Sequence, residues 1–326
     1  MRFSPLFILI LLLPFSASAQ IFPDLGNAAS FTLTSLPQYP APYSKVSLSF
    51  LSSSLDLTNT TLTVTANGKN IYQGSVQPVA VTLGKTGSVT QVTATLSSGG
   101  AHYSQSLTIQ PQDVALIAEP ISSSPILYPG KSLVPLEGNV RVVAVANLKN
   151  AAGKSSDPST FSYAWVVDGV QIMNSSGIGK SVIMVASPLQ YRGRDVSVAV
   201  TTPDGSLVGG ASLSLSALEP SIRIYENDPL LGIRFDHALS NQYAIAAEST
   251  LYAAPFSLPT TNGTPLVQWF LNGNAAQTGN SITLRPTGSG QGTAMLSLTA
   301  SSGDYIKATA NLSLLFGAKS TNFFGL

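Results

Sequence analysis

Alternating apolar and polar positions recur along this chain, and they predict β-strands rather than helices. Valine, alanine and leucine occupy every second position in residues 92–96, 196–200 and 294–300, mostly with threonine, serine or alanine between them. A period of two places one face of a strand against a core and the other in water, as in antiparallel sheets. No long segment has the apolar spacing of an amphipathic helix. The pattern therefore predicts an all-β fold.

Turn signals repeat with these strands. Three dipeptides precede them at intervals of about a hundred residues: Asn67-Gly68, Asp168-Gly169 and Asn272-Gly273. Such pairs tolerate the positive φ that a two-residue hairpin turn requires. A second turn and a closing strand follow each time, so the same order of elements occurs three times.

A period near a hundred residues, with frequent turn signals, is typical of immunoglobulin-like sandwiches. Two short strands that end in an acidic residue and a proline place the boundaries near Pro111 and Pro220. We therefore expect three tandem antiparallel β-sandwich domains after a signal peptide. Their ranges are 20–111, 112–219 and 220–316, with a tail at 317–326.

Trp165 and Trp269 lie in alternating strands, and Tyr163 shares the apolar face of the first. The pattern favours buried rings that pack between two sheets. The alternative is a stacking platform for a sugar, which needs exposed, coplanar rings. Asp168 has no second carboxylate nearby in sequence, so we interpret it as a turn residue rather than a catalytic acid.

The stretch from Tyr163 to Gly169 (YAWVVDG) resembles the Y-x-W-x-x-x-G strand and turn of PKD-type and related immunoglobulin-like modules. Residues 269–273 (WFLNG) are similar, whereas the first repeat has no tryptophan before Asn67-Gly68 and matches only in its turn. The resemblance implies a bacterial extracellular or cell-surface protein built of tandem sandwiches that serve as spacers or binding units. It implies no catalytic residues.

The first nineteen residues have the form of a secretory signal peptide. Arg2 precedes an apolar run at 6–13, and Ala17-Ser18-Ala19 forms an A-x-A cleavage site. The alternative is a membrane anchor, but the run stops at Pro14, short of the roughly 20 residues that a spanning helix needs. We expect an exported protein with no transmembrane segment in the mature chain.

Composition narrows the function classes. Charged residues are 10%, against about 25% in typical proteins. The net charge is +1 without a basic run, so the electrostatic footprint of nucleic-acid binding is missing. The chain has no cysteine, which excludes thiolate chemistry and leaves stability to burial alone.

Catalytic motifs are weak. His102 and His237 are expected in loops, and no G-x-S-x-G sequence accompanies them. Gly179-Lys180-Ser181 lacks the earlier glycine of a phosphate-binding loop, since Asn174 stands there, and a strand pattern follows. We therefore expect a protein that is not an enzyme. An enzyme would need an acid, a base and a nucleophile brought together from distant positions.

Glu226, Asp228 and Asp236 are candidate calcium ligands just after the second boundary. Calcium takes six to eight oxygens, and no D-x-D-x-D loop is present, so a solvated acidic linker is the alternative. No other cofactor is expected.

The final residues include Phe323, Phe324 and Leu326, which are either a frayed end or a docking peptide. Together these features predict a non-enzymatic exported spacer, scaffold or adhesion protein. Its expected partner is an envelope or surface protein or a polysaccharide. The alternative is a carbohydrate- or protein-binding array, with calcium assisting.

Overall fold

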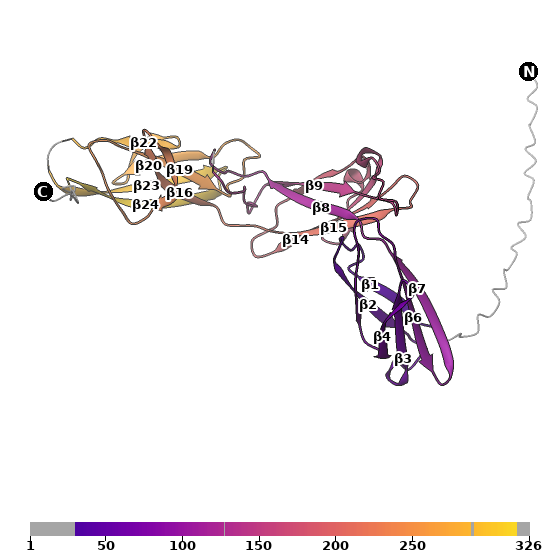
Figure 1. The fold of residues 1–326 in the computed structure, drawn as a ribbon. Helices are drawn as coiled ribbons and strands as arrows, with labels where there is room; N and C mark the ends of the chain where they lie inside the picture. Colours follow the sequence, from indigo (N-terminus) through magenta and orange to yellow (C-terminus); the bar gives the residue numbers. More distant parts are fainter. Residues whose placement is uncertain (1–29, 127, 288–289, 318–326) are drawn as a thin grey trace, which may run out of the picture. The chain divides into compact units, whose positions relative to one another are not determined.

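A computed structural model describes residues 30–126, 128–287 and 290–317 (Figure 1). The predicted signal peptide at 1–19 and the tail residues Phe323, Phe324 and Leu326 lie outside them. The chain divides into two compact units. Among the described residues, one unit holds 30–34 with Leu48–Val79 and Val92–Leu107, and the other holds Ser35–Ser47, Ala80–Gln91 and the described residues from Thr108 onward.

The fold is all-β, as the alternation predicts. The described residues contain six sheets and no α-helix, only the 3-10 turns η1 (Leu57–Asn59), η2 (Pro158–Thr160) and η3 (Met173–Ser175). The fold class is that of tandem immunoglobulin-like sandwiches.

Two sheets come from the first repeat. One has the order β1-β2-β5 and the other β4-β3-β6-β7. The strands are β1 (Thr32–Leu36), β2 (Lys45–Leu51), β3 (Thr61–Ala66), β4 (Lys69–Ser75), β5 (Val79–Thr82), β6 (Thr90–Ser98) and β7 (Ala101–Ile109). In β6 the alternation is complete, because Val92, Ala94 and Leu96 are fully buried.

Hydroxyl groups line the exposed side of β6 and β7. Thr95 Oγ1 lies 2.9 Å from Ser104 Oγ, and Ser97 Oγ lies 2.8 Å from His102 Nδ1. Cross-strand pairs of this kind stabilise a sheet. They explain how the outer faces can be polar in a chain with few charged residues.

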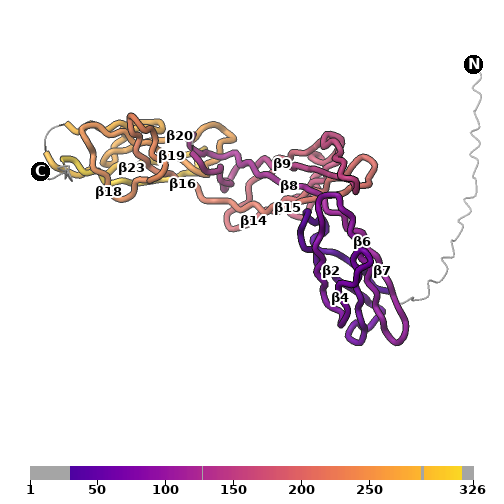
Figure 2. Tube along the Cα trace, viewed as in Figure 1, coloured from indigo at the N-terminus to yellow at the C-terminus, as the bar shows by residue number. Residues whose placement is uncertain are grey.

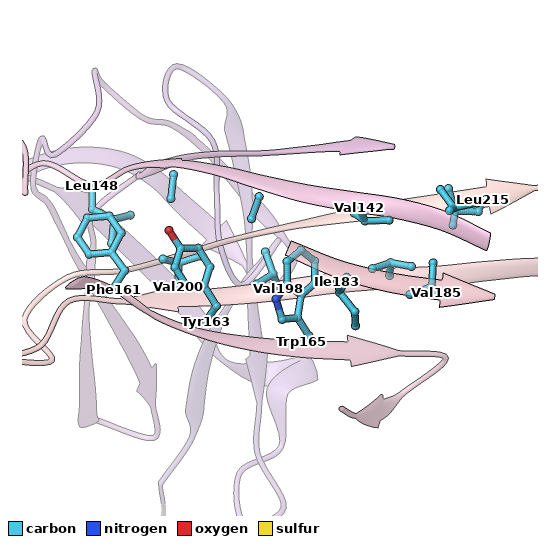
Figure 3. Close-up of a cluster of buried hydrophobic side chains, with 14 of the residues drawn as sticks. Val142, Leu148, Phe161, Tyr163, Trp165, Ile183, Val185, Val198, Val200 and Leu215 are labelled. Atoms are coloured by element: carbon cyan, nitrogen blue, oxygen red, sulfur yellow. The ribbon is translucent and has the colours of Figure 1, made fainter. Parts of the chain in front are cut away.

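The second repeat forms one sheet with the order β13-β9-β8 and another with the order β11-β10-β14-β15, where β12 also pairs with β10. The strands are β8 (Asp113–Pro120), β9 (Asn139–Asn147), β10 (Ser162–Val167), β11 (Val170–Gln171), β12 (Gly177–Ile178), β13 (Val182–Ala186), β14 (Gly193–Thr201) and β15 (Val208–Ser216). Residues from both sheets meet in one core (Figure 3).

Trp165 lies at the centre of that core with no exposed surface (Figure 3). It faces Val198 across the β10–β14 pair, and its indole Nε1 donates to the carbonyl of Lys180 at 2.8 Å. Tyr163 is also buried, and its hydroxyl donates to the carbonyl of Pro158 at 3.1 Å. A buried aromatic residue that satisfies its polar atom is a stable core element.

The third repeat has the sheets β17-β16-β19-β22 and β18-β24-β23-β20-β21. The strands are β16 (Ser221–Asp228), β17 (Gly232–Leu239), β18 (Gln242–Ala244), β19 (Ser249–Phe256), β20 (Leu266–Leu271), β21 (Asn274–Thr278), β22 (Ser281–Leu284), β23 (Gly292–Ser302) and β24 (Ile306–Phe316). The short pairing of β18 with β24 is parallel, which the predicted antiparallel pattern did not include.

Trp269 repeats the arrangement of Trp165. It is fully buried, faces Leu298 on β23, and donates from Nε1 to the carbonyl of Gly279 at 2.8 Å. Both tryptophans therefore bind the carbonyl of a loop that follows the hairpin, so the same core geometry is built twice.

The three Asn-Gly or Asp-Gly pairs have matching backbones. Asn67, Asp168 and Asn272 have φ of 49°, 50° and 49°, and the glycines after them have φ of 78°, 79° and 82°. Two successive residues at positive φ form the tight turn that suits the twist of a hairpin.

Candidate functional site

The two tryptophans provide no stacking platform, because neither ring is exposed. Asp168 lies in its hairpin turn. Its carboxylate accepts from the backbone N–H of Asp195 at 2.9 Å and from Arg194 Nε at 3.1 Å. Asn272 occupies the same place in the third sandwich and accepts from the backbone N–H of Met295 at 2.9 Å. Both side chains tie a turn to the next strand.

The candidate calcium ligands have separate partners. Glu226 accepts from the Tyr243 hydroxyl at 3.0 Å, and Asp236 pairs with Arg234 at 3.2 Å. Asp228 accepts from the backbone N–H groups of Leu231 and Leu230, which lower its pKa. No group of three or more His, Asp or Glu residues that could hold a metal ion occurs in the described part of the chain.

The histidines lie in strands rather than the expected loops. His102 is in β7, where it pairs with Ser97 across the exposed side of β6 and β7, and His237 is in β17. Sequence reasoning missed the contact of His102 with Ser97 because a cross-strand neighbour is set by register. Within the described residues, no carboxylate is hydrogen-bonded to His102, so this pair lacks the third member of a catalytic triad.

The Gly179-Lys180-Ser181 segment supports the core. Its Lys180 carbonyl accepts from Trp165, and Lys180 Nζ donates to the carbonyl of Asn174 at 2.8 Å. The strand β13 follows it, where a phosphate-binding loop would have a helix.

The connection between β8 and β9, residues 121–138, joins two strands of the second sandwich but packs on the third (Figure 2). Its Tyr128 ring meets the rings of Phe256 and Phe235 edge-on, with centroids 5.0 and 5.8 Å apart. We call residues 121–138 the connecting segment. It places an aromatic side chain of one sandwich on the outer face of the next.

Hydrogen bonds fix the connecting segment in place. Ser123 N donates to the carbonyl of Leu258 at 2.7 Å, and Leu258 N donates to Ser123 Oγ at 3.1 Å. The Ser257 hydroxyl lies 2.9 Å from the carbonyl of Leu218 and 3.2 Å from that of Val134. Ser257 is fully buried, so these bonds are shielded from water.

A polar hollow of about 290 Å³ lies beside this junction. Its walls are the start of β9 at 137–139, the chain after β19 at 259–262, and the β23–β24 turn at 302–306. We call it the junction hollow. The exposed ring of Tyr305 lines it, together with Glu137 and Asp304.

Sequence reasoning missed these residues. Glu137, Asn262 and Tyr305 come from three distant turns, and no spacing links them. The one sequence signal that points to this region is the turn at 302–304. The alternation predicts that this turn lies between two strands, but it does not predict that the turn lies near the other two segments.

No family model matches the chain, and no curated protein matches it in sequence. Several solved structures are similar to it at low identity. The three N-terminal domains of the bacteriophage RB49 highly immunogenic outer capsid protein are 11% identical, with 89% of this chain and 99% of that chain covered and a TM-score of 0.25. Immunoglobulin domains 1–5 of Sidekick-1 are 10% identical, with 89% and 60% covered and a TM-score of 0.30. The Bacteroides ovatus protein SGBP-B, solved with a mixed-linkage heptasaccharide, is 12% identical, with 88% and 70% covered and a TM-score of 0.22. These similarities assign no ligand or partner to this chain.

Over the described ranges, no helix is long and apolar enough to cross a membrane.

Proposed function

We propose that this protein is an exported, non-enzymatic spacer, scaffold or adhesion protein of the bacterial cell surface or envelope. The observation that carries the proposal is the junction of the second and third sandwiches. Buried hydrogen bonds and an aromatic contact link the two there, where a simple tether would leave them free to rotate. A fixed pair of sandwiches transmits a defined spacing to its ends.

Two features support export and a surface role. The signal-like segment at 1–19 suits a secreted chain. The resemblance of residues 163–169 to PKD-type modules adds a bacterial surface context. The proposed partner is an envelope or surface protein or a polysaccharide, reached through loops at the ends of sandwiches.

Cysteine labelling on intact producing cells tests this proposal, because the native chain has no thiol to react. Lys154→Cys places a thiol in an exposed turn of the second sandwich, and Ala300→Cys places one in the core of the third. A membrane-impermeant maleimide should label the Lys154→Cys chain on intact cells and leave the Ala300→Cys chain unlabelled. Labelling of Lys154→Cys only after lysis would contradict a surface location.

A second candidate function, an array that binds carbohydrate or protein, is favoured by the junction hollow. Its polar and aromatic lining offers a binding surface whose walls come from both sandwiches.

A further inference from the structure

We propose that the junction hollow binds a neutral saccharide, with Tyr305 as the platform for the sugar ring. The inference names a ligand class for the binding role described above and rests on it. Six side chains carry it: Glu137, Asn139, Thr261, Asn262, Asp304 and Tyr305.

The walls of the hollow are held by backbone contacts. Gly138 has φ of +121°, and a Cβ there would lie 3.0 Å from Pro259 Cβ. Its carbonyl accepts from Ser187 N at 2.9 Å, and the carbonyl of Pro259 accepts from Ser302 Oγ at 2.5 Å. The hollow is therefore present before any ligand arrives, which reduces the entropy cost of binding.

The two carboxylates of the junction hollow have no hydrogen-bond donor within the described residues, unlike most other carboxylates there. Elsewhere, a carboxylate usually accepts a hydrogen bond from an arginine, a backbone N–H, or a neighbouring hydroxyl or amide, as at Asp168 and Asp228. The described exceptions are Asp113, Glu137, Asp195 and Asp304, and two of these four line the same hollow. Glu137 and Asp304 therefore have acceptor atoms free for a ligand.

The other polar groups add donors. The side-chain amides of Asn139 and Asn262 have no hydrogen-bond partner within the described chain, and each can donate and accept. The Thr261 hydroxyl has the same capacity. Behind the wall, the buried Ser187 Oγ also lacks a partner. The hollow thus combines charged hydrogen-bond acceptors with neutral groups that can both donate and accept hydrogen bonds.

Tyr305 supplies an apolar surface. Its side chain is 92% exposed, and its ring contacts no other aromatic ring among the residues described. Tyrosine contributes a large contact area at low entropy cost because it has few rotatable bonds. Its position on the wall of the hollow makes the ring available to a ligand that occupies the hollow.

A saccharide matches this combination. Its hydroxyl groups both donate and accept, so they can bind carboxylates and amides at once, and bonds to a carboxylate are charge-assisted. The C–H face of a sugar ring suits a tyrosine ring. A volume of about 290 Å³ is just below the usual range for small-molecule sites, which fits one sugar unit of a longer chain. Calcium is a poorer match, since only two of the lining side chains are carboxylates and no group of three or more acidic or histidine residues that could hold a metal ion occurs in the described chain.

NMR titration of the full mature chain tests the inference. The probes are glucose, galactose, mannose and N-acetylglucosamine, and oligosaccharides from the envelope polysaccharide of the producing cells. We expect shifts of the amide signals at 137–139, 261–262 and 303–306 with at least one of these probes. Shifts elsewhere, or no shift with any of them, would overturn it.

Matched variants distinguish a loss of stacking on the sugar ring from a loss of folding. Tyr305→Ala should weaken binding by about tenfold or more, whereas Tyr305→Phe should retain it. The control is Tyr191→Ala, which removes a tyrosine that is 94% exposed but does not line the hollow, and binding should be unchanged. If N-acetyl-lysine amide or calcium shifts these signals and no saccharide does, the site binds cations and the inference is wrong. Surface labelling at Lys154→Cys does not depend on either outcome.

Discussion

The Ser257 hydroxyl donates to the carbonyl of Leu218, 2.9 Å away, and so joins the third sandwich to the chain that leaves the second. Ser257 has φ of +59°, a left-handed conformation that costs a non-glycine residue roughly 1–2 kcal/mol. The backbone accepts this conformation at a position where the side chain is fully buried and bonded. The junction is therefore a packed structure with a defined geometry.

The hairpin turns should tolerate Asn and Asp but not Ala. Asp168→Ala removes the acceptor for Asp195 N and places alanine at φ of 50°, so we expect a loss of about 2 kcal/mol in the free energy of unfolding. Hydrogen exchange of β10 and β14 under increasing urea measures it.

The matched control for this turn is Asp168→Asn, since Asn272 fills the same place in the third sandwich. It keeps the acceptor and loses only an exposed ion pair with Arg194, which is worth at most about 1 kcal/mol. Equal effects of Ala and Asn would show that the turn geometry is unimportant.

The tryptophans should be needed for their N–H groups as well as their bulk. Trp269→Phe leaves the carbonyl of Gly279 without its donor and opens space in the core, so unfolding of the third sandwich should become easier by about 2–4 kcal/mol. Urea-dependent hydrogen exchange in β20 and β23 measures the change. Tyr191→Ala, at an exposed position, serves as a control with no expected effect. A core unaffected by Trp269→Phe would contradict this role.

Asp204 should stay ionised as the pH is lowered to about 2. Hydrogen bonds from the side chains of Thr202 and Ser206, and from the backbone N–H of Ser206, lower its pKa to about 2. Because the folded pKa lies below the unfolded value of about 3.9, its stabilising contribution is complete above that value and disappears as the pH falls through about 2. A carboxyl ¹³C titration should show a midpoint near 2. An ordinary midpoint would mean that the Thr202 bond does not form in solution.

Calcium should not change the melting temperature. Glu226, Asp228 and Asp236 are occupied by a tyrosine hydroxyl, backbone N–H groups and an arginine, so they offer no common site. Calorimetry in calcium and in chelator should give the same value. A higher melting temperature in calcium would show that the ion gathers ligands that the free chain keeps apart.

Local signals predicted the fold because each repeat is built from them. The alternation in 92–96 and 196–200 predicts which residues are buried, and the turn pairs mark the hairpins. The register between strands and the contacts between distant segments could not be predicted in this way. The connecting segment packs on the third sandwich through Tyr128, and the pattern along one strand carries no information about such a contact.

The junction hollow illustrates the same limit. Most of the second and third sandwiches lies between Glu137 and Tyr305 in sequence, and only the folded junction brings them to one hollow. The calcium candidates show the converse. Glu226 and Asp228 are close in sequence, yet their side chains bind different partners. The register of β16 shifts between Tyr225 and Asn227, and Asp228 ends the strand, where it accepts from the backbone of the following turn.

The distance across the junction tests the central claim most directly. Spin labels at Met184→Cys and Met295→Cys, on exposed positions of β13 and β23, report it by pulsed electron paramagnetic resonance in a chain with no other thiol. We predict one narrow distance distribution. Tyr128→Ala or Ser257→Ala should broaden it, whereas Ser155→Ala, whose hydroxyl bonds Asn147 within the second sandwich, should not. A broad distribution in the parent chain, unchanged by these variants, would contradict a fixed junction.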